Sequence, residues 1–364
     1  MTKKFSDIVE PVLTFLTVLL LGSVFVLPQG AAQRLAYAAA CAALPEGGIM
    51  QIRKSLVPAA QTIPAQAAST APSTSFDTPP DILRSITIAQ RKEKSQKKDG
   101  DIREKTYDAS SGTEMFRGLC IRNITEDVEP DYDEAWEAGP ELSVDKSKPA
   151  VLIVHTHTTE GYETLDRDWY AADEITRTND TNRNIARVGT AIAEQLEAEG
   201  FRVLHDKTVH DTKYSGAYDR SRATIQQYLK RYPELSVVLD VHRDAIQDNN
   251  GTKVKPVTTV NGKKAAQIMI IAGTQGGTGS AQTFTTWEKN FRFALRLQDA
   301  CEATAPTLMR PVFFCYRKYN MDLTPCSLLV EFGSEANTLQ EAVYAGQLFG
   351  HALAGFLEQY VKES

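Results

Sequence analysis

The sequence is poor in cysteine, which excludes several common kinds of site. Its 364 residues include the five cysteines Cys41, Cys120, Cys301, Cys315 and Cys326. No two of them stand at CxxC spacing, so the chain has neither a zinc ribbon nor a thioredoxin-like motif. An odd number also gives no support to a disulfide framework. One bridge, for example between Cys315 and Cys326, stays possible if the domain is exported.

An excess of positive charge is also missing. The formal net charge is -6, so the chain offers no basic field for holding nucleic acid, and we expect no nucleic-acid partner. There is no Gly-x-Ser-x-Gly elbow and no cysteine in a matching context, which gives a serine or thiol nucleophile little support. The glycine-rich stretch 273–280 lacks the Gly-Lys-Ser/Thr ending of a phosphate loop.

The N-terminus carries an apolar run from Val12 to Leu27, preceded by Lys3 and Lys4. This pattern predicts a membrane anchor, although the run is slightly short of the roughly 20 residues that a full span needs. A cleaved signal peptide ending near 36–39 is the alternative. Because the lysines precede the run, they should stay inside. We therefore expect a single-pass protein of the cell membrane whose catalytic part is extracytoplasmic.

Composition divides the chain into four parts. Residues 1–30 form the predicted cytoplasmic tip and transmembrane anchor, and 31–113 a low-complexity linker that includes a stretch rich in Pro, Ala, Ser and Thr. Residues 114–148 alternate apolar and acidic character and form a small lead-in segment of unknown role. The predicted catalytic domain is 149–364.

From Pro149 onward, short apolar runs alternate with segments of helical periodicity. The runs predict strands at 151–154, 201–204, 237–241, 267–272 and 327–330. The periodicity predicts helices at 185–196, 223–232, 287–303 and 337–360. Such alternation is typical of an α/β fold, so we expect a three-layer, twisted, mostly parallel sheet with helices on both faces.

Polar clusters follow three of these predicted strands. The first contains His155, His157 and Glu160, the second His242, and the third Glu331. Functional groups in open α/β sheets gather at the carboxyl ends of strands, so the clusters should lie close together. Zinc takes imidazole and carboxylate ligands, with three from the protein at a catalytic site and a fourth position for water. The clusters therefore predict a catalytic zinc ion.

Several roles within the predicted site stay open. Glu331 is the candidate general base and acid, because partial burial at a strand end would raise its pKa. Asp240 shares a strand face with His242, where it either orients the imidazole or is an ordinary hydrogen-bonded carboxylate. Asp180 is a reserve metal ligand. The His155 and His157 pair can also be read as strand side chains that hydrogen-bond to backbone carbonyls.

Read in order, these motifs resemble the stage II sporulation protein P family of cell-wall hydrolases. The main matching stretches are VLIVHTHTTEGY at 151–162, TNRNIARVG at 181–189, LDVHRDA at 239–245 and LLVEFGSEANT at 328–338. The resemblance covers about residues 149 to 360. More distantly, the domain is similar to the zinc-dependent N-acetylmuramoyl-L-alanine amidases.

The resemblance implies a substrate, ligands and partners. It implies cleavage in peptidoglycan of the amide between N-acetylmuramic acid and L-alanine, together with cleavage of peptide cross-links. It implies Zn²⁺ held by two histidines and a carboxylate, with stage II sporulation proteins D and M as partners at the membrane. His242 matches the second zinc histidine of the amidases. Counting from the strand start favours His157 over His155 as the first, and Glu160 and Asp180 compete for the carboxylate position, where Glu160 is preferred.

In the resulting mechanism, Glu331 relays the proton, and Arg243 or Arg222 steadies a substrate carboxylate or the developing oxyanion. A protein of another class would fit the same features if the domain were a catalytically silent scaffold that binds the wall and recruits a separate hydrolase. Hydrolysis of some other amide is a third reading.

Overall fold

The computed structural model describes residues 76–93, 96–171 and 176–362, and Ser73–Ser364 form one compact unit. The predicted anchor and the first part of the predicted linker lie outside the described residues, so both stay predictions. Within the described ranges, no helix is both long enough and apolar enough to cross a bilayer.

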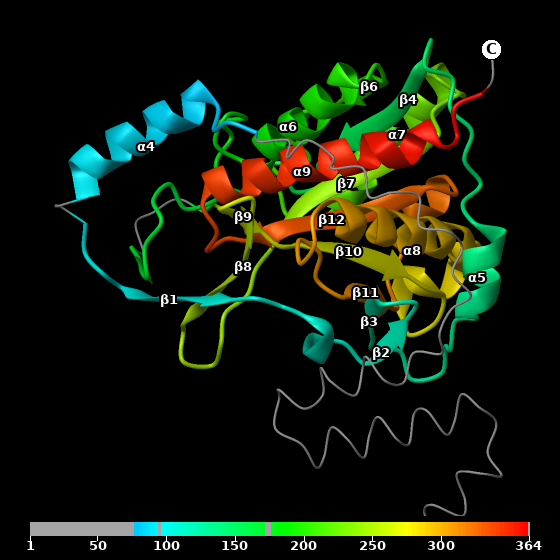
Figure 1. Ribbon diagram of the computed structural model, residues 1–364, viewed down its shortest axis with the longest axis horizontal. Helices are drawn as coiled ribbons and strands as arrows, with labels where there is room; N and C mark the ends of the chain where they lie inside the picture. The colour runs from blue at the N-terminus through cyan, green and yellow to red at the C-terminus, as the bar shows by residue number, and fades with distance from the viewer. Residues whose placement is uncertain (1–75, 94–95, 172–175, 363–364) are drawn as a thin grey trace, which may run out of the picture. The chain divides into compact units, whose positions relative to one another are not determined.

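Eight strands form the main sheet, in the order β2-β3-β11-β10-β12-β7-β4-β6 (Figure 1). Their bounds are β2 (Glu114–Phe116), β3 (Leu119–Asn123), β4 (Pro149–Val154), β6 (Arg202–His205), β7 (Val237–Asp244), β10 (Ile268–Gly273), β11 (Val312–Cys315) and β12 (Ser327–Ser334). Neighbours are parallel except at two places, where β10 runs antiparallel to β12 and β2 antiparallel to β3. The expectation of a mixed α/β fold with a mostly parallel sheet is confirmed.

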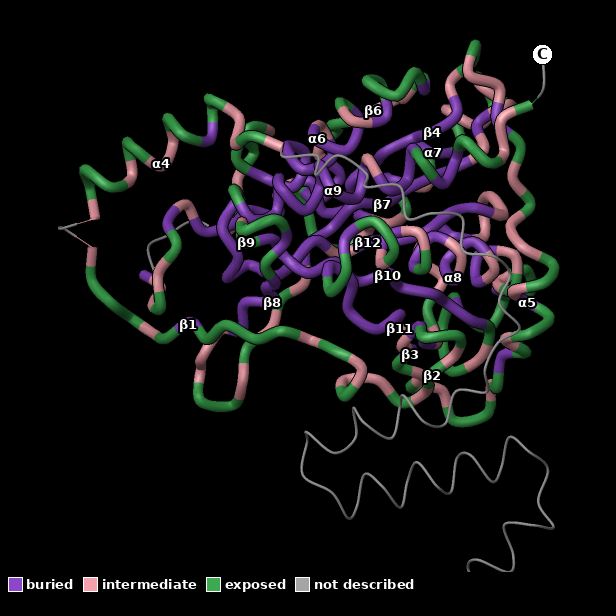
Figure 2. Tube along the Cα trace, in the orientation of Figure 1, coloured by how far each residue is buried: buried purple, intermediate pink, exposed green. Residues whose placement is uncertain are grey.

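Helices cover the two faces of this sheet unequally. The long helices are α6 (Ile185–Ala198), α7 (Ala217–Arg231), α8 (Trp287–Thr304) and α9 (Leu339–Glu358). Side chains of α6, α8 and α9 share one large core with alternate residues of the central strands. On the opposite face, Ile225 of α7 packs against Leu152, Val154 and Val238, so α7 covers only the β4 and β7 side. Figure 2 shows the buried positions concentrated in the central strands and α9.

A second sheet has four strands in the order β5-β1-β8-β9. Its bounds are β1 (Gly100–Lys105), β5 (Trp169–Tyr170), β8 (Lys253–Val260) and β9 (Lys263–Ala266). The remaining elements are α4 (Pro80–Lys92), α5 (Tyr132–Ala138) and the short 3-10 helices η2 (Ala109–Ser111), η3 (Gly279–Thr283) and η4 (Met321–Leu323). The second sheet is held to α9 by Lys255 of β8, whose Nζ lies 2.9 Å from Glu341.

The structure extends or corrects several expectations. β2, β3 and α5 come from the lead-in segment, yet β3 pairs with β11 and so belongs to the main sheet. Strands β7 and β12 run past their predicted ends, so that His242 and Glu331 lie inside strands and not after them. The suggested bridge is absent, because Cys315 and Cys326 are both free thiols buried in the core.

Candidate active site

The candidate site is built around His242, near the end of β7, and Asp240 on the same face of that strand. Asp240 Oδ1 accepts a hydrogen bond from His242 Nε2 at 2.8 Å and from the backbone N of Thr156 at 2.8 Å. Burial acts to lower the pKa of His242, but the neighbouring carboxylates of Asp240 and Glu160 outweigh it and hold that pKa well above its usual value. The two carboxylates therefore favour a positive charge at the Nδ1 side of this ring, carried by a proton or by a metal ion that takes its place, and Asp240 is the orienting partner of the ring.

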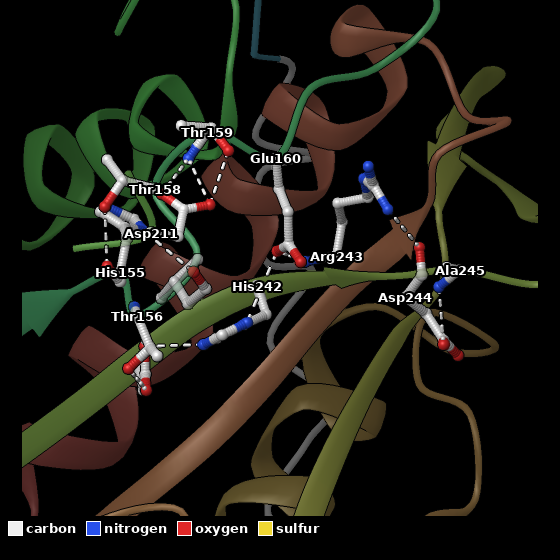
Figure 3. A network of polar contacts seen from close by, with 12 residues as sticks. His155, Thr156, Thr158, Thr159, Glu160, Asp211, His242, Arg243, Asp244 and Ala245 are labelled. Atoms are coloured by element: carbon white, nitrogen blue, oxygen red, sulfur yellow. Dashed lines mark hydrogen bonds and ion pairs between the residues drawn. The ribbon is translucent and has the colours of Figure 1, made fainter. Parts of the chain in front are cut away.

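Glu160 lies on the other side of the same imidazole. Its Oε2 is 3.5 Å from His242 Nδ1 and accepts a hydrogen bond from the backbone N of Arg243 at 3.1 Å (Figure 3). Burial would raise the pKa of Glu160, but the hydrogen bond and charge of His242 outweigh it and lower that pKa. Glu160 is therefore an anionic group held against the ring nitrogen that Asp240 leaves available.

His157 completes the group from the loop that follows β4. Its ring lies edge-to-face with that of His242, with 5.3 Å between centroids, and stacks flat on Tyr214 at 4.6 Å. Burial lowers the pKa of His157, so its ring favours the neutral form. The Nδ1 atom is buried and has no hydrogen-bond partner. A neutral imidazole with an unsatisfied nitrogen is the form in which histidine binds a metal.

Glu331 stands on β12 directly beside His242 in the strand register, so both side chains lie on one face of the sheet. Burial, with the negative charge of Asp244, raises the pKa of Glu331 to about 8. Its Oε2 is buried without a hydrogen-bond partner. Glu331 therefore combines a near-neutral pKa with an oxygen that is free to take or give a proton.

His155 occupies a different place from His157. Its Nδ1 bonds to the carbonyl of Val241 at 2.8 Å and its Nε2 to the ring of His205 at 2.9 Å. Since both ring nitrogens are engaged in hydrogen bonds, His155 has no nitrogen free for a metal. Its two hydrogen bonds connect the end of β4 to the neighbouring strands β7 and β6. The reserve ligand Asp180 lies exposed in a turn, where it accepts from the backbone N of Asn182.

The two candidate arginines also have partners of their own. Arg243 is buried, and its Nε and Nη2 donate to the backbone carbonyls of Gly161 and Thr176, at 3.0 Å each. It thus holds the Glu160 loop in place, and its predicted contact with a substrate stays a prediction. Arg222 forms a bidentate ion pair with Asp322, in which Nη1 and Nη2 donate to Oδ1 and Oδ2 at 2.7 and 2.8 Å. Neither role was visible in the sequence, because the partners are distant along the chain.

The chemistry of His157, Glu160 and His242 fits zinc, since two imidazoles and a carboxylate are ordinary ligands of that metal. Their donor atoms do not all lie within 4.8 Å of one another. Among the described residues, the three-member group that meets this spacing is Glu104, Asp166 and Glu341.

That acidic group already has its cations. Lys255 Nζ contacts all three carboxylates, at 3.1, 2.5 and 2.9 Å, and Lys264 pairs with Glu104 and Asp166. The group is therefore an ion-pair cluster, and the unsatisfied His157 nitrogen makes the His242 region the better metal site.

Comparison with known proteins decides the family. The model of the family "Stage II sporulation protein P (SpoIIP)" matches residues 57–354. The chain belongs to the SpoIIP family. The predicted resemblance is thus confirmed, and the matched range includes the lead-in segment as well as the catalytic part.

The sequence identity to an individual member of the family is low. The stage II sporulation protein P of Bacillus subtilis (strain 168) is 28% identical over 217 residues, which is 56% of this chain and 50% of that protein. This chain thus matches half the length of its SpoIIP relative.

Solved structures with a similar fold include amidases. The N-acetylmuramoyl-L-alanine amidase AmiC2 of Nostoc punctiforme has a TM-score of 0.35 at 11% identity, over 58% of this chain and 96% of its own. The CwlD amidase from Clostridioides difficile, solved in complex with the GerS lipoprotein, has a TM-score of 0.34 at 12% identity, over 58% and 98%. TM-scores this low do not bear on the activity of this chain.

The sequence analysis of this SpoIIP family member did not predict the aromatic residues that surround His157. Tyr218 of α7 stands edge-on to His157 at 5.5 Å and stacks on Tyr319 at 5.0 Å. Tyr214 is 69% exposed although it covers His157. Arg177 reaches both Asp211, at 2.9 Å, and the Tyr214 ring. The short stretch YDRS at 218–221 also resembles the family and was a usable signal for Tyr218, whereas no such stretch contains Tyr214 or Arg177.

Proposed function

We propose that this chain is a zinc-dependent peptidoglycan hydrolase that cleaves the amide between N-acetylmuramic acid and L-alanine during engulfment in sporulation. The observation that carries the proposal is a pair of buried, unsatisfied polar atoms, His157 Nδ1 and Glu331 Oε2, on either side of His242. Leaving such atoms without partners costs about 1–3 kcal/mol each, so a bound group is expected to satisfy them. Membership of the SpoIIP family supports the substrate class.

His157, Glu160 and His242 would hold the metal. Zinc, when bound, supplies a Lewis acid that polarises the amide carbonyl and makes water acidic enough to attack near neutral pH. Asp240 accepts from His242 Nε2, which keeps the proton on that nitrogen and leaves Nδ1 for the metal. Arg243 fixes the Glu160 loop through two backbone carbonyls.

Glu331 moves the proton. Its pKa of about 8 lies close to neutral pH, where general acid and base catalysis is most efficient. In the ionised form Glu331 Oε2 takes a proton from the attacking water. In the protonated form it returns that proton to the departing amine of L-alanine.

Three further properties belong to the same proposal. The site also cleaves peptide cross-links of the wall, which present a similar amide. Residues 1–30 anchor the chain in the cell membrane, with the catalytic part outside the cytoplasm. Stage II sporulation proteins D and M are its partners there.

The test uses the purified full-length chain and intact sacculi. Incubation should release soluble stem peptides with a free L-alanine amino group, identified by mass spectrometry. Release should stop with a chelator and return with zinc, and metal analysis should find one zinc ion per chain. His157→Ala should lose that zinc, whereas His351→Ala on α9, a matched histidine paired with Glu199, should keep it.

The scaffold alternative predicts a different outcome. A catalytically silent chain would bind sacculi and release no peptide, with no stoichiometric metal. Release that continues undiminished in the presence of a chelator would contradict the zinc mechanism while leaving hydrolysis itself intact.

A further inference from the structure

The ring of Tyr218 lies beside the candidate metal ligands. Tyr218 is in the first turn of α7, and its ring packs against the cluster that contains Met269, the register neighbour of Glu331. The ring is nearly parallel to that of His242, with 6.4 Å between centroids, and stands edge-on to His157 at 5.5 Å. Tyr218 therefore lies over the face of the sheet that carries the candidate site.

The hydroxyl of Tyr218 has no hydrogen-bond partner among the described residues. Burial, together with the negative charges of Asp240, Glu331 and Glu160, raises the pKa of Tyr218, so the hydroxyl keeps its proton near neutral pH. All three carboxylates belong to the candidate site. Because electrostatic effects fall off with distance, their influence indicates that the hydroxyl lies close to that site. A protonated phenol without a partner is a hydrogen-bond donor available to a bound substrate.

Contacts of both the backbone and the ring hold Tyr218 in place. Its backbone carbonyl accepts from Ser221 Oγ at 3.1 Å and from Asn320 Nδ2 at 3.0 Å. Its ring stacks on that of Tyr319, with 5.0 Å between centroids and 20° between the planes. The hydroxyl is thus oriented before a substrate binds, and such preorganisation makes a donor effective toward a developing charge.

The proposed reaction needs a donor of this kind. Attack of water on an amide moves negative charge onto the carbonyl oxygen, and catalytic sites stabilise that charge with donors within hydrogen-bond distance of the oxygen. The two arginines predicted for this role already donate elsewhere, Arg243 to two backbone carbonyls and Arg222 to Asp322. The hydroxyl of Tyr218 has no such competing acceptor.

We propose that Tyr218 is a further catalytic residue of this site, whose hydroxyl donates a hydrogen bond to the oxygen of the cleaved amide as that oxygen becomes negative. The inference rests on the proposed function. A hydrogen bond to an anionic oxygen is roughly twice as strong as one to a neutral oxygen, so the contact stabilises the tetrahedral intermediate more than the substrate. Tyr218 keeps its proton throughout, and Glu331 carries the proton from the water to the departing amine.

The experiment compares Tyr218→Phe with the wild type on soluble N-acetylmuramyl tetrapeptide, using the zinc-loaded full chain. Phenylalanine keeps the ring that stacks on Tyr319 and removes only the hydroxyl. We expect kcat to fall about 100-fold, as when an oxyanion loses one donor, with KM and zinc content unchanged. Tyr228→Phe is the matched control on the same helix, because the Tyr228 hydroxyl donates to Asp206 and its ring packs under α7. Its kcat should stay at the wild-type value.

A phosphinate analogue of the cleaved amide gives a readout that does not depend on turnover. The analogue is tetrahedral and carries negative charge where the intermediate does. Tyr218→Phe should therefore weaken its binding, measured by calorimetry, by about the same factor as kcat. The free energy of unfolding of the variant should stay close to that of the wild type.

Two results would overturn the role of Tyr218 while leaving the proposed function intact. One is a Tyr218→Phe chain that keeps the wild-type kcat and affinity for the analogue. The other is a parallel loss of affinity for the substrate and the analogue, which would indicate a structural role. A wild-type chain that cleaves no muropeptide would instead overturn the proposed function, and the role of Tyr218 with it.

Discussion

At the scale of single residues, the charge state of Glu331 depends on where β12 places it. Two apolar neighbours along the strand, Val330 and Phe332, are fully buried on the other face. The alternation that buries them directs Glu331 to the face that carries His242. A carboxyl group in this position is costly to ionise, and that cost is what brings its pKa near neutrality.

Replacing Glu331 with Gln should reduce peptide release by about 10²–10⁴-fold, the usual contribution of a general acid or base. Zinc content should be unchanged, because Glu331 is not among the ligands. The measurement is kcat on sacculi or soluble muropeptides, with metal analysis of the same sample. Glu302→Gln is the control, since burial also raises the pKa of Glu302 but the residue accepts from Thr307 and Met309 near the end of α8. A Glu331→Gln chain with normal kcat would remove this residue from the mechanism.

The residues that could be predicted from sequence are those whose role depends on local periodicity. Asp240 and His242 are two positions apart on one strand, so their common face followed from the alternation of side chains. The choice between His155 and His157 could not be made in this way. It depends on His205, which lies fifty positions further along the chain and takes up the second nitrogen of His155.

At the scale of elements, a glycine lets α6 pack closely against the paired histidines His155 and His205. A methyl group on Gly189 would lie 2.7 Å from the Nε2 atoms of both His155 and His205. Ala normally stabilises a helix interior by up to about 1 kcal/mol relative to Gly. Here the steric conflict should reverse the sign.

Gly189→Ala should therefore lower the free energy of unfolding by about 1–3 kcal/mol, the usual cost of overpacking. Gly355→Ala on α9, where the added methyl group meets nothing within 4 Å, should be neutral or stabilise by up to about 1 kcal/mol. Denaturant unfolding of both variants measures the difference. A stabilised Gly189→Ala chain would show that α6 does not pack as described.

The same histidine pair should make stability depend on pH. Burial lowers the pKa of His155 to about 4 and that of His205 to about 2, so the folded chain keeps both rings neutral. The unfolded chain takes up these protons below its histidine pKa of about 6.5. Stability should therefore fall as the pH falls from about 6.5 toward about 4, by at most about 1.4 kcal/mol per pH unit for each group.

In His205→Gln this loss between pH 6.5 and pH 4 should be less steep, because one of the two groups is gone. His351→Gln, at the surface beside Glu199, should keep the wild-type slope. The measurement is the free energy of unfolding at a series of pH values. Identical slopes in His205→Gln and the wild type would contradict the assignment.

Most core elements were predictable because each carries a clear apolar period. The helix predicted at 185–196 and α6 differ by two residues at one end, and the strand predicted at 151–154 lies within β4. β8, β9 and β1 were missed. β1 pairs with β8 across a long stretch of sequence, so no local pattern revealed it. β8 and β9 form a hairpin around Asn261 and Gly262, and this Asn-Gly pair was a local signal that the sequence analysis did not use.

At the scale of the whole molecule, Lys255 connects parts of the chain that are far apart in sequence. The side chain is 1% exposed and contacts Glu104 of β1, Asp166 and Glu341 of α9. A buried charge of this kind is tolerated because its partners surround it. Removing it would leave Glu341 buried without its cation.

Lys255→Met should lower the free energy of unfolding by about 3–5 kcal/mol. Lys253→Met is the matched control on the same strand, where the ammonium group lies 4.1 Å above the ring of Tyr170 and only partly buried. Its loss should cost about 1 kcal/mol or less. Thermal or denaturant unfolding separates the two. Similar stabilities would show that the buried lysine does not hold the second sheet to α9.

The pairing of β3 with β11 bears on where this protein can be shortened. A chain cut at Pro149 would lose β2 and β3, and the backbone amides and carbonyls of β11 that pair with β3 would be left without partners at the edge of the sheet. An unpaired edge strand of this kind pairs with strands of other molecules, so the shortened protein should aggregate. A chain cut before Glu114 would keep β2 and β3, and β3 would still cover the edge of β11.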